Sequence, residues 1–199
     1  MKKSLLTCAL ALLSSVACAP SKILLEQESL PEHTISQNVP SISTDDGSIR
    51  VTILPDGDNE LVVCNAHSFN FVLSRSSKIK WDTRIIVAGD VVAIEQDNFD
   101  MALSVNVLVA PFDGTSKQFA NDFAADLATK PGFVVRDVTE FPNDVYVIRS
   151  ELGEIVKGVF SIRVKDGRMY SVTGVAPYNS IHYVSVISVV NSFSFIEKT

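Results

Sequence analysis

The sequence lacks the features of several common functional classes. Lys and Arg number 17 against 23 Asp and Glu, the formal net charge is −6, and no block of basic residues is present. Nucleic-acid binding depends on a Lys/Arg surface, so we expect no nucleic-acid partner. No stretch after residue 20 is long and apolar enough to form a transmembrane helix.

Cysteine is scarce, with three in 199 residues. Cys8 and Cys18 lie within the first twenty residues, so Cys64 is left alone and cannot form an internal disulfide. Apolar neighbours at 61–63 favour a small buried apolar residue at this position. A reactive thiol is the alternative, but no basic neighbour is present to lower its pKa.

Motifs for catalysis and metal binding are also missing. The chain contains no HExxH, CxxC, GxSxG, Walker loop or dinucleotide glycine pattern, and its histidines, His33, His67 and His182, do not share metal-ligand spacing. Two acidic clusters, DGDNE at 56–60 and EQDNFD at 95–100, offer oxygen ligands for a hard cation. The first lacks EF-hand spacing, however, and acidic residues are common in ordinary turns. We therefore assign no metal, no cofactor and no catalytic residue, and we predict a protein that is not an enzyme.

The chain begins with the pattern of an export signal. Lys2 and Lys3 precede a short apolar stretch at 5–13, and small residues follow it. The sequence SVAC, ending at Cys18, resembles a bacterial lipobox, although Ser15 stands where that pattern usually has Leu. The resemblance implies a signal peptide at 1–17 and a lipid such as palmitate on Cys18. Ordinary cleavage, which leaves a soluble periplasmic protein, is the alternative.

The mature chain divides into a tether and a domain. Residues 18–46 are rich in Ser, Pro, Gln and acids and lack sustained periodicity, which is typical of a flexible tether. From residue 47 onward apolar residues alternate, and the overall composition of 46% hydrophobic and 20% charged residues is that of a folded protein. We predict one domain over 47–199.

Strand patterns dominate this domain, and one helix interrupts them. Apolar residues alternate most regularly at 103–109. A helix is predicted over 115–129, because Thr115 and Gln118 form a capping box and apolar residues recur every four positions from Phe119. Asp166-Gly167 between two alternating runs predicts a hairpin with a type I′ turn.

Residues 179–192 are rich in Val and Ile, which favour strands. At 100° per residue, however, Tyr183, Val184, Val186, Ile187 and Val190 fall on one broad face, and Ser185, Ser188 and Ser192 gather opposite them. A strand would place these serines on both faces. We therefore predict a helix that is capped by Asn179 or Ser180.

The end of the sequence resembles the PsbP family. The resemblance lies in GVFSIRVKDGRMYSVTGVAP at 158–177, in the predicted helix that follows, and in NSFSF at 191–195. Upstream, SFNFVLSRSSKIKW at 68–81 and VNVLVAP at 105–111 are similar to earlier parts of the family. The family includes the photosystem accessory protein PsbP, the envelope lipoprotein DcrB and a Ran-binding nuclear-import factor.

The resemblance implies an α+β fold in which an antiparallel β-sheet carries helices packed on both faces, an α/β/α sandwich. It implies no single activity, because fold is not function. Together with Cys18, it leads us to expect an envelope lipoprotein that binds or helps assemble another envelope component, with a protein partner. Ala19 after Cys18 favours the outer membrane, facing the periplasm.

Two aromatic residues are candidate partner contacts. Trp81 follows two lysines and Tyr178 lies near the last hairpin, although Trp81 also fits the edge of the core. The alternative function is that of a small-ligand or metal-binding periplasmic protein, or of an enzyme with an unrecognised pocket.

Overall fold

Alternating apolar residues fold this chain into twelve strands and two helices within the described residues. The computed structural model describes residues 41–56, 59–74, 81–98 and 102–196. The predicted signal peptide and the lipidation candidate Cys18 lie outside these ranges. The elements are β1 (Ser41–Ser43), β2 (Arg50–Asp56), β3 (Asn59–Cys64), β4 (Phe69–Ser74), β5 (Asp82–Ala88), β6 (Val91–Asn98), β7 (Leu103–Pro111), α2 (Ser116–Thr129), β8 (Phe133–Phe141), β9 (Val145–Leu152), β10 (Val156–Lys165), β11 (Arg168–Pro177), α3 (Tyr183–Ser192) and β12 (Ser194–Phe195).

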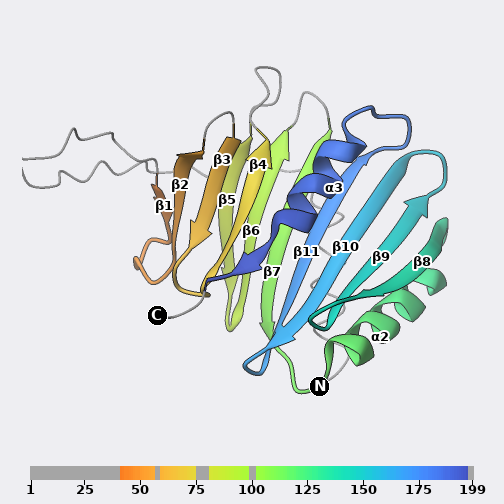
Figure 1. Cartoon of the computed structure of the whole chain (residues 1–199), viewed down its shortest axis with the longest axis horizontal. Helices are drawn as coiled ribbons and strands as arrows, with labels where there is room; N and C mark the ends of the chain where they lie inside the picture. The colour runs from red at the N-terminus through yellow and green to blue at the C-terminus, as the bar shows by residue number, and fades with distance from the viewer. Residues whose placement is uncertain (1–40, 57–58, 75–80, 99–101, 197–199) are drawn as a thin grey trace, which may run out of the picture.

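The strands form two sheets (Figure 1). One has five strands in the order β1-β2-β3-β4-β12, and the other has seven in the order β5-β6-β7-β11-β10-β9-β8. Every neighbouring pair is antiparallel, as the sequence predicts. The prediction of a single sheet is wrong. Phe71 in β4 and Val107 in β7 belong to one buried cluster, so the two sheets share a core instead of continuing each other.

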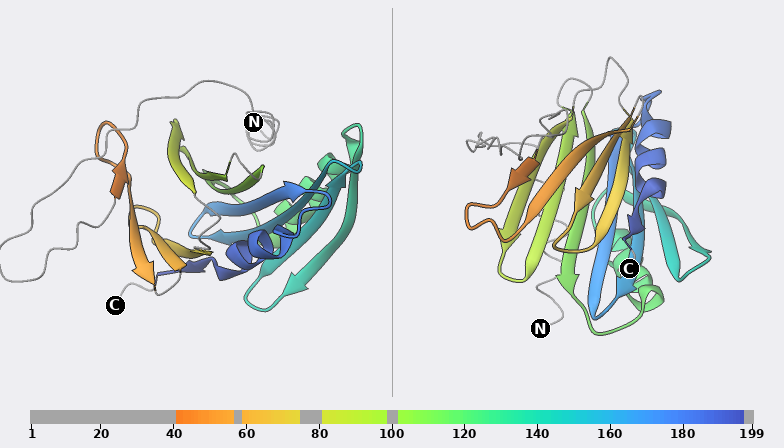
Figure 2. Two further views of the ribbon diagram at one scale, coloured as in Figure 1. Left: turned by 90° about the horizontal axis from the view of Figure 1, so that it is seen from above. Right: turned by 60° about the vertical axis from the view of Figure 1, so that its left-hand side comes forward.

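Alternation along the large sheet divides the interior into two clusters. In β10, Val159 joins the cluster shared with the small sheet, whereas Phe160 and Ile162 join a second cluster with α2. Figure 2 shows α2 and α3 on different sides of the large sheet, with the small sheet beside α3. The predicted α/β/α sandwich is not confirmed, because strands form most of the layer on the α3 side. Within the described residues, no helix has the length and apolar character needed to cross a membrane.

The α2 helix follows its prediction. The Thr115 side chain accepts a hydrogen bond from the Gln118 amide at 3.1 Å, which caps the first turn. Phe119, Phe123 and Leu127 are buried against the large sheet. The helix therefore begins and packs as its capping box and four-residue spacing indicate.

The α3 helix is confirmed but is shorter and rotated relative to the prediction. It begins at Tyr183, and the Ser180 hydroxyl accepts from the His182 amide in the preceding turn instead of capping the helix. The buried residues are Val186, Val189 and Val190. Val184 was predicted to be buried but is exposed, because two residues of helix turn it almost to the opposite side from Val186.

The predicted polar face of α3 is also corrected at Ser192. Its hydroxyl accepts a hydrogen bond from the Val72 amide of β4 at 2.8 Å and donates to the Val189 carbonyl at 2.7 Å. Ser192 therefore joins the helix to the small sheet.

The folded part of the chain begins before residue 47, the predicted start of the domain. β1 pairs with β2 from Ser41, within the segment that was predicted to be a tether.

The last hairpin forms as predicted. Lys165 pairs with Arg168, and both intervening residues have positive φ, 52° at Asp166 and 72° at Gly167. This short turn fixes the register of β10 against β11 over ten residue pairs. That register in turn determines which β10 side chains face α3.

Candidate functional site

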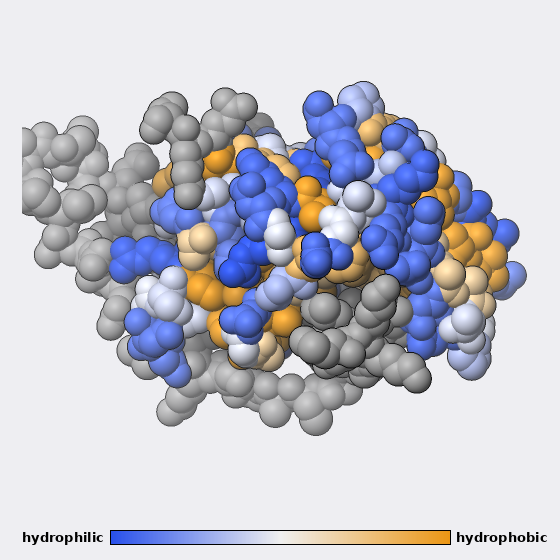
Figure 3. Space-filling view, turned by 90° about the horizontal axis from the view of Figure 1, so that it is seen from below, coloured by the Kyte–Doolittle hydropathy of each residue, from blue (hydrophilic) through white to orange (hydrophobic). Residues whose placement is uncertain are grey.

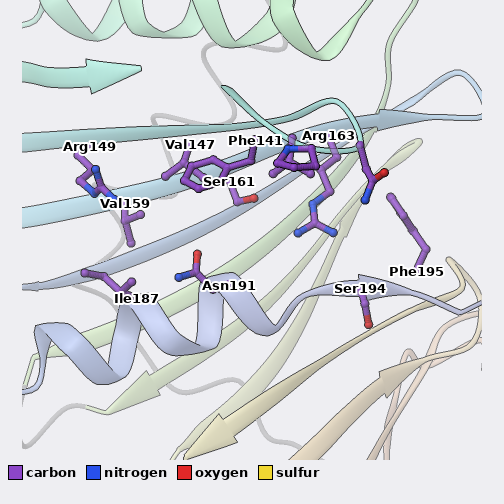
Figure 4. Close-up of a pocket in the computed structure, with 13 residues that line it drawn as sticks. Phe141, Val147, Arg149, Val159, Ser161, Arg163, Ile187, Asn191, Ser194 and Phe195 are labelled. Carbon is purple, nitrogen blue, oxygen red and sulfur yellow. The ribbon is translucent and has the colours of Figure 1, made fainter. Parts of the chain in front are cut away.

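A groove of about 470 Å³ lies between α3 and the strands β9 and β10 (Figure 4). Its floor is the α3 side of the large sheet, and one wall is formed by α3 and the chain that follows it. The size lies within the range of small-molecule sites. The lining residues are Phe141, Pro142, Asn143, Val145, Val147, Arg149, Val159, Ser161, Arg163, Ile187, Asn191, Ser194 and Phe195.

Strand alternation places the polar side chains in this groove. Val159, Ser161 and Arg163 are alternate residues of β10, so they lie on one face of the strand, and all three line the groove. The same rule places Val147 and Arg149 of β9 beside them. The floor of the groove therefore combines apolar residues with two guanidinium groups.

The opposing wall comes from one side of α3. Ile187 and Asn191 are four residues apart on the helix and both line the groove. Figure 4 shows the Asn191 amide directed toward the strand that carries Ser161. Asn191 is exposed and Ser161 is buried, and each brings a side chain that can donate a hydrogen bond to the lining of the groove. Both can therefore serve as donors to a bound molecule.

Arg163 is the unusual charge of the groove. Burial lowers the pKa of its guanidinium, because desolvation disfavours the charged form, although arginine stays protonated. Its Nε atom is buried and has no hydrogen-bond partner among the described residues. Its Cζ lies 5.0 Å from the centroid of the Phe193 ring, a cation–π contact that offsets part of the cost of desolvation.

The other cation of the groove is already paired. Arg149 Nη1 lies 3.2 Å from Asp137 Oδ2 at the protein surface. Among the described residues that line the groove, none is Asp or Glu. The local charge is thus positive in a chain whose net charge is negative.

A second hollow of about 330 Å³ lies at the β10–β11 hairpin. Burial, and then the charge of Arg168, lower the pKa of His67, so the imidazole is neutral at pH 7. Its Nε2 is buried and has no hydrogen-bond partner in the described structure. Figure 3 shows the molecule from below, and hydrophilic and hydrophobic residues alternate over the face that is visible in this view. The lining residues are Ala66, His67, Ser68, Lys165, Asp166, Arg168, Tyr170, Phe195 and Ile196.

Neither predicted partner contact lines these hollows. Trp81 is partly buried and packs against the core, which agrees with its alternative interpretation as a residue of the core edge. Tyr178 is half-buried, and the Lys157 ammonium lies 4.3 Å from the centroid of its ring. The amide of Tyr178 donates to the Ile155 carbonyl at 2.8 Å, which places it beside the β9–β10 turn.

Around Tyr178 the structure exposes large aliphatic side chains. Ile155 is 70% exposed, Ile181 85% and Val184 72%. We call Ile155, Tyr178, Ile181 and Val184 the apolar tip. Figure 1 shows the β9–β10 turn and the chain between β11 and α3 together at the upper end of the molecule. Of these four residues, only Tyr178 was predicted from the sequence to be a candidate partner contact.

Sequence reasoning missed Arg163 and Ser161. The alternation in FSIRV indicates that the two share a face of β10, but only the position of α3 leaves a groove above that face. Cys64 is buried as predicted, and burial raises the pKa of its thiol. The described residues contain no group of three His, Cys, Asp or Glu side chains arranged for a metal, while Asp58 and Asp100 of the acidic clusters lie outside them.

Comparison with known proteins supports the fold. No family model matches the sequence, and no curated protein matches it. The chain is similar to the solution structure of cyanobacterial PsbP (CyanoP) from Synechocystis sp. PCC 6803, with a TM-score of 0.50 and 10% sequence identity, over 71% of this chain and 95% of that chain. At this identity the likeness shows the fold alone. The chain has a PsbP-like fold built from antiparallel sheets.

Proposed function

We propose that this protein is a non-enzymatic lipoprotein of the bacterial envelope whose PsbP-like domain binds a protein partner through the apolar tip. The observation that carries the proposal is the exposure of Ile155, Ile181 and Val184 around Tyr178. Apolar side chains that gather on a surface next to an aromatic residue and a cation are typical of protein contacts. The Cys18 context supplies the expected anchor on the outer membrane.

The arrangement at the tip favours a contact over a purely structural role. Lys157 lies between two tyrosine rings, 4.3 Å from the Tyr178 centroid and 5.9 Å from that of Tyr183. These contacts hold the aromatic side chains in place, so less side-chain entropy is lost when a partner binds. Each exposed aliphatic side chain would in addition release ordered water on contact.

Photo-crosslinking in living cells tests this surface. A photoreactive phenylalanine analogue replaces Ile181 in one strain and Ile86, an isoleucine of β5 that is 42% exposed, in the control strain. We expect a discrete crosslinked protein from position 181 that is absent from position 86. Identical products from both positions, or none from position 181, would contradict the proposal.

The anchor is tested separately. Cells fed a fatty-acid analogue should label the wild-type protein but not the Cys18→Ala variant. Equal labelling of both, or no labelling of either, would reject the lipid at Cys18. The crosslinking result does not depend on this outcome.

A second candidate function is small-ligand binding, and the groove between α3 and the strands β9 and β10 favours it. The groove has the volume of a ligand site, and the Arg163 Nε donor among its lining residues has no hydrogen-bond partner in the described structure. It shares no lining residue with the apolar tip. Both binding functions can therefore coexist in one domain.

A further inference from the structure

We propose that the groove beside α3 binds an apolar molecule through a single carboxylate, which the Arg163 guanidinium holds. This inference goes beyond the protein contact at the apolar tip and rests on different residues. Arg163 is the recognition group, Ser161 and Asn191 are supporting donors, and the valines of β9 and β10 receive the apolar part.

The first argument is the cost of the Arg163 charge. A charge removed from water is costly unless a counter-charge or hydrogen bonds compensate it. The aromatic ring of Phe193 supplies part of the compensation, yet Nε remains without a partner and no acidic side chain lines the groove. A bound carboxylate would complete the compensation, because its two oxygens match the planar fork of a guanidinium.

The second argument concerns the number of negative charges. Arg149, the other cation of the groove, is already bridged to Asp137 at 3.2 Å. One guanidinium is therefore left for the ligand, which matches a monoanion better than a phosphate with two charges. Ser161 and Asn191 can donate further hydrogen bonds to the carboxylate oxygens.

The third argument concerns the remainder of the ligand. Val147, Val159 and Ile187 line the groove next to the polar groups, so a molecule bound at Arg163 places its body against aliphatic surface. The volume of about 470 Å³ accommodates a small molecule or a few residues of a peptide. A free aliphatic acid and the end of a polypeptide both carry this chemistry, and the probes below distinguish them.

Titration calorimetry with the purified full chain tests the proposal. The probes are octanoate and a capped Ala-Val-Phe peptide with a free C-terminal carboxylate, and each is compared with its neutral amide. We expect at least one acid to bind about ten- to a hundredfold more tightly than its amide, since the amide lacks the charge that Arg163 recognises. Binding of octanoate alone identifies a free acid, and binding of the peptide alone identifies a chain terminus.

Variants assign the effect to Arg163. R163Q should weaken binding of the acid about ten- to a hundredfold and leave binding of the amide unchanged. R163K should retain part of the preference for the acid over its amide. The control R136Q removes an equal charge from β8, where Arg136 pairs with Glu151 outside the groove, and should bind as the wild type does. If R163Q does not fold, N191F decides, because Asn191 is exposed on α3 and a phenylalanine there obstructs the groove and should abolish binding.

Three results would overturn the inference: no binding of either acid, equal binding of acids and amides, or unchanged binding of the acid in a folded R163Q variant (in N191F, if R163Q does not fold). None of them would affect the crosslinking experiment at Ile181. Conversely, a failed crosslink at the tip leaves the ligand titration intact, so the two proposals fail separately.

Discussion

Gly174 of β11 allows α3 to lie close to the large sheet. Replacing Gly174 with alanine should therefore lower the free energy of unfolding. A Cβ atom at this position would lie 2.8 Å from Val190 Cγ2 and 3.2 Å from Val159 Cγ1, and it would clash with Val186 Cγ1. All three valines are buried. The methyl group of Gly174→Ala therefore has no free space, and the helix or the valines must move.

The expected cost follows from two opposing effects. Overpacking a core by one methyl group costs about 1–3 kcal/mol. Replacing glycine with alanine also lowers the conformational entropy of the unfolded chain, which stabilises the folded protein by about 0.4–1 kcal/mol. We therefore expect Gly174→Ala to lower the free energy of unfolding by about 1–2 kcal/mol in urea denaturation.

A double-mutant cycle with Val186→Ala isolates the clash. Val186→Ala alone removes buried methyl groups and should cost about 1.5–3 kcal/mol. Together with Gly174→Ala it also removes the atoms that the new methyl group would meet. The double variant should be more stable than the sum of the single effects by about 1 kcal/mol or more. Additivity within about 0.5 kcal/mol would refute the proposed contact.

Three further predictions concern single side chains. Ser192→Ala leaves the Val72 amide without its hydrogen-bond acceptor and should cost about 1–3 kcal/mol in thermal unfolding, whereas Ser188→Ala at an exposed position of the same helix should change stability by less than about 0.5 kcal/mol. Hydrogen bonds from Thr44 and Ser48 lower the pKa of Asp46 from 3.8 to about 2, so an NMR titration should show its carboxylate charged at pH 3. The stabilisation that these hydrogen bonds give is complete above pH 3.8 and disappears as the pH falls through about 2. An ordinary pKa for Asp46 would contradict the turn geometry. Burial raises the pKa of the Cys64 thiol, so iodoacetamide should modify it only after unfolding, and rapid modification of the folded protein would be inconsistent with its burial.

The proposed binding sites occupy different parts of one scaffold. The groove depends on the close seating of α3 on the sheet, whereas the apolar tip depends on the turns that precede α3. Gly174→Ala should therefore change carboxylate binding in the groove more than it changes a protein contact at Ile181. This gives the two sites a common structural origin and separate energetics.

The sequence by itself determined the local structure of this protein. The serine spacing at 183–192 indicated a helix, although contacts with the two sheets decided which of its residues are buried. The capping box at Thr115 and the Asp166-Gly167 turn act over a few residues, so the local sequence was enough to predict them. The burial of Cys64 followed in the same way from its apolar neighbours. The PsbP-like tail could also be identified, because its order of hairpin, helix and final phenylalanines is continuous in the sequence.

Only the tertiary structure decided how many sheets form and where binding surfaces lie. Strand alternation specifies that a face is apolar, but not whether a helix or another sheet covers it, so one sheet was predicted where two share a core. The groove requires that α3, seated on Gly174, stand beside Arg163 of a strand that precedes it in the chain. The apolar tip requires that two separate turns meet. Such contacts join residues that are distant in sequence, and local patterns carry no information about the distance between them.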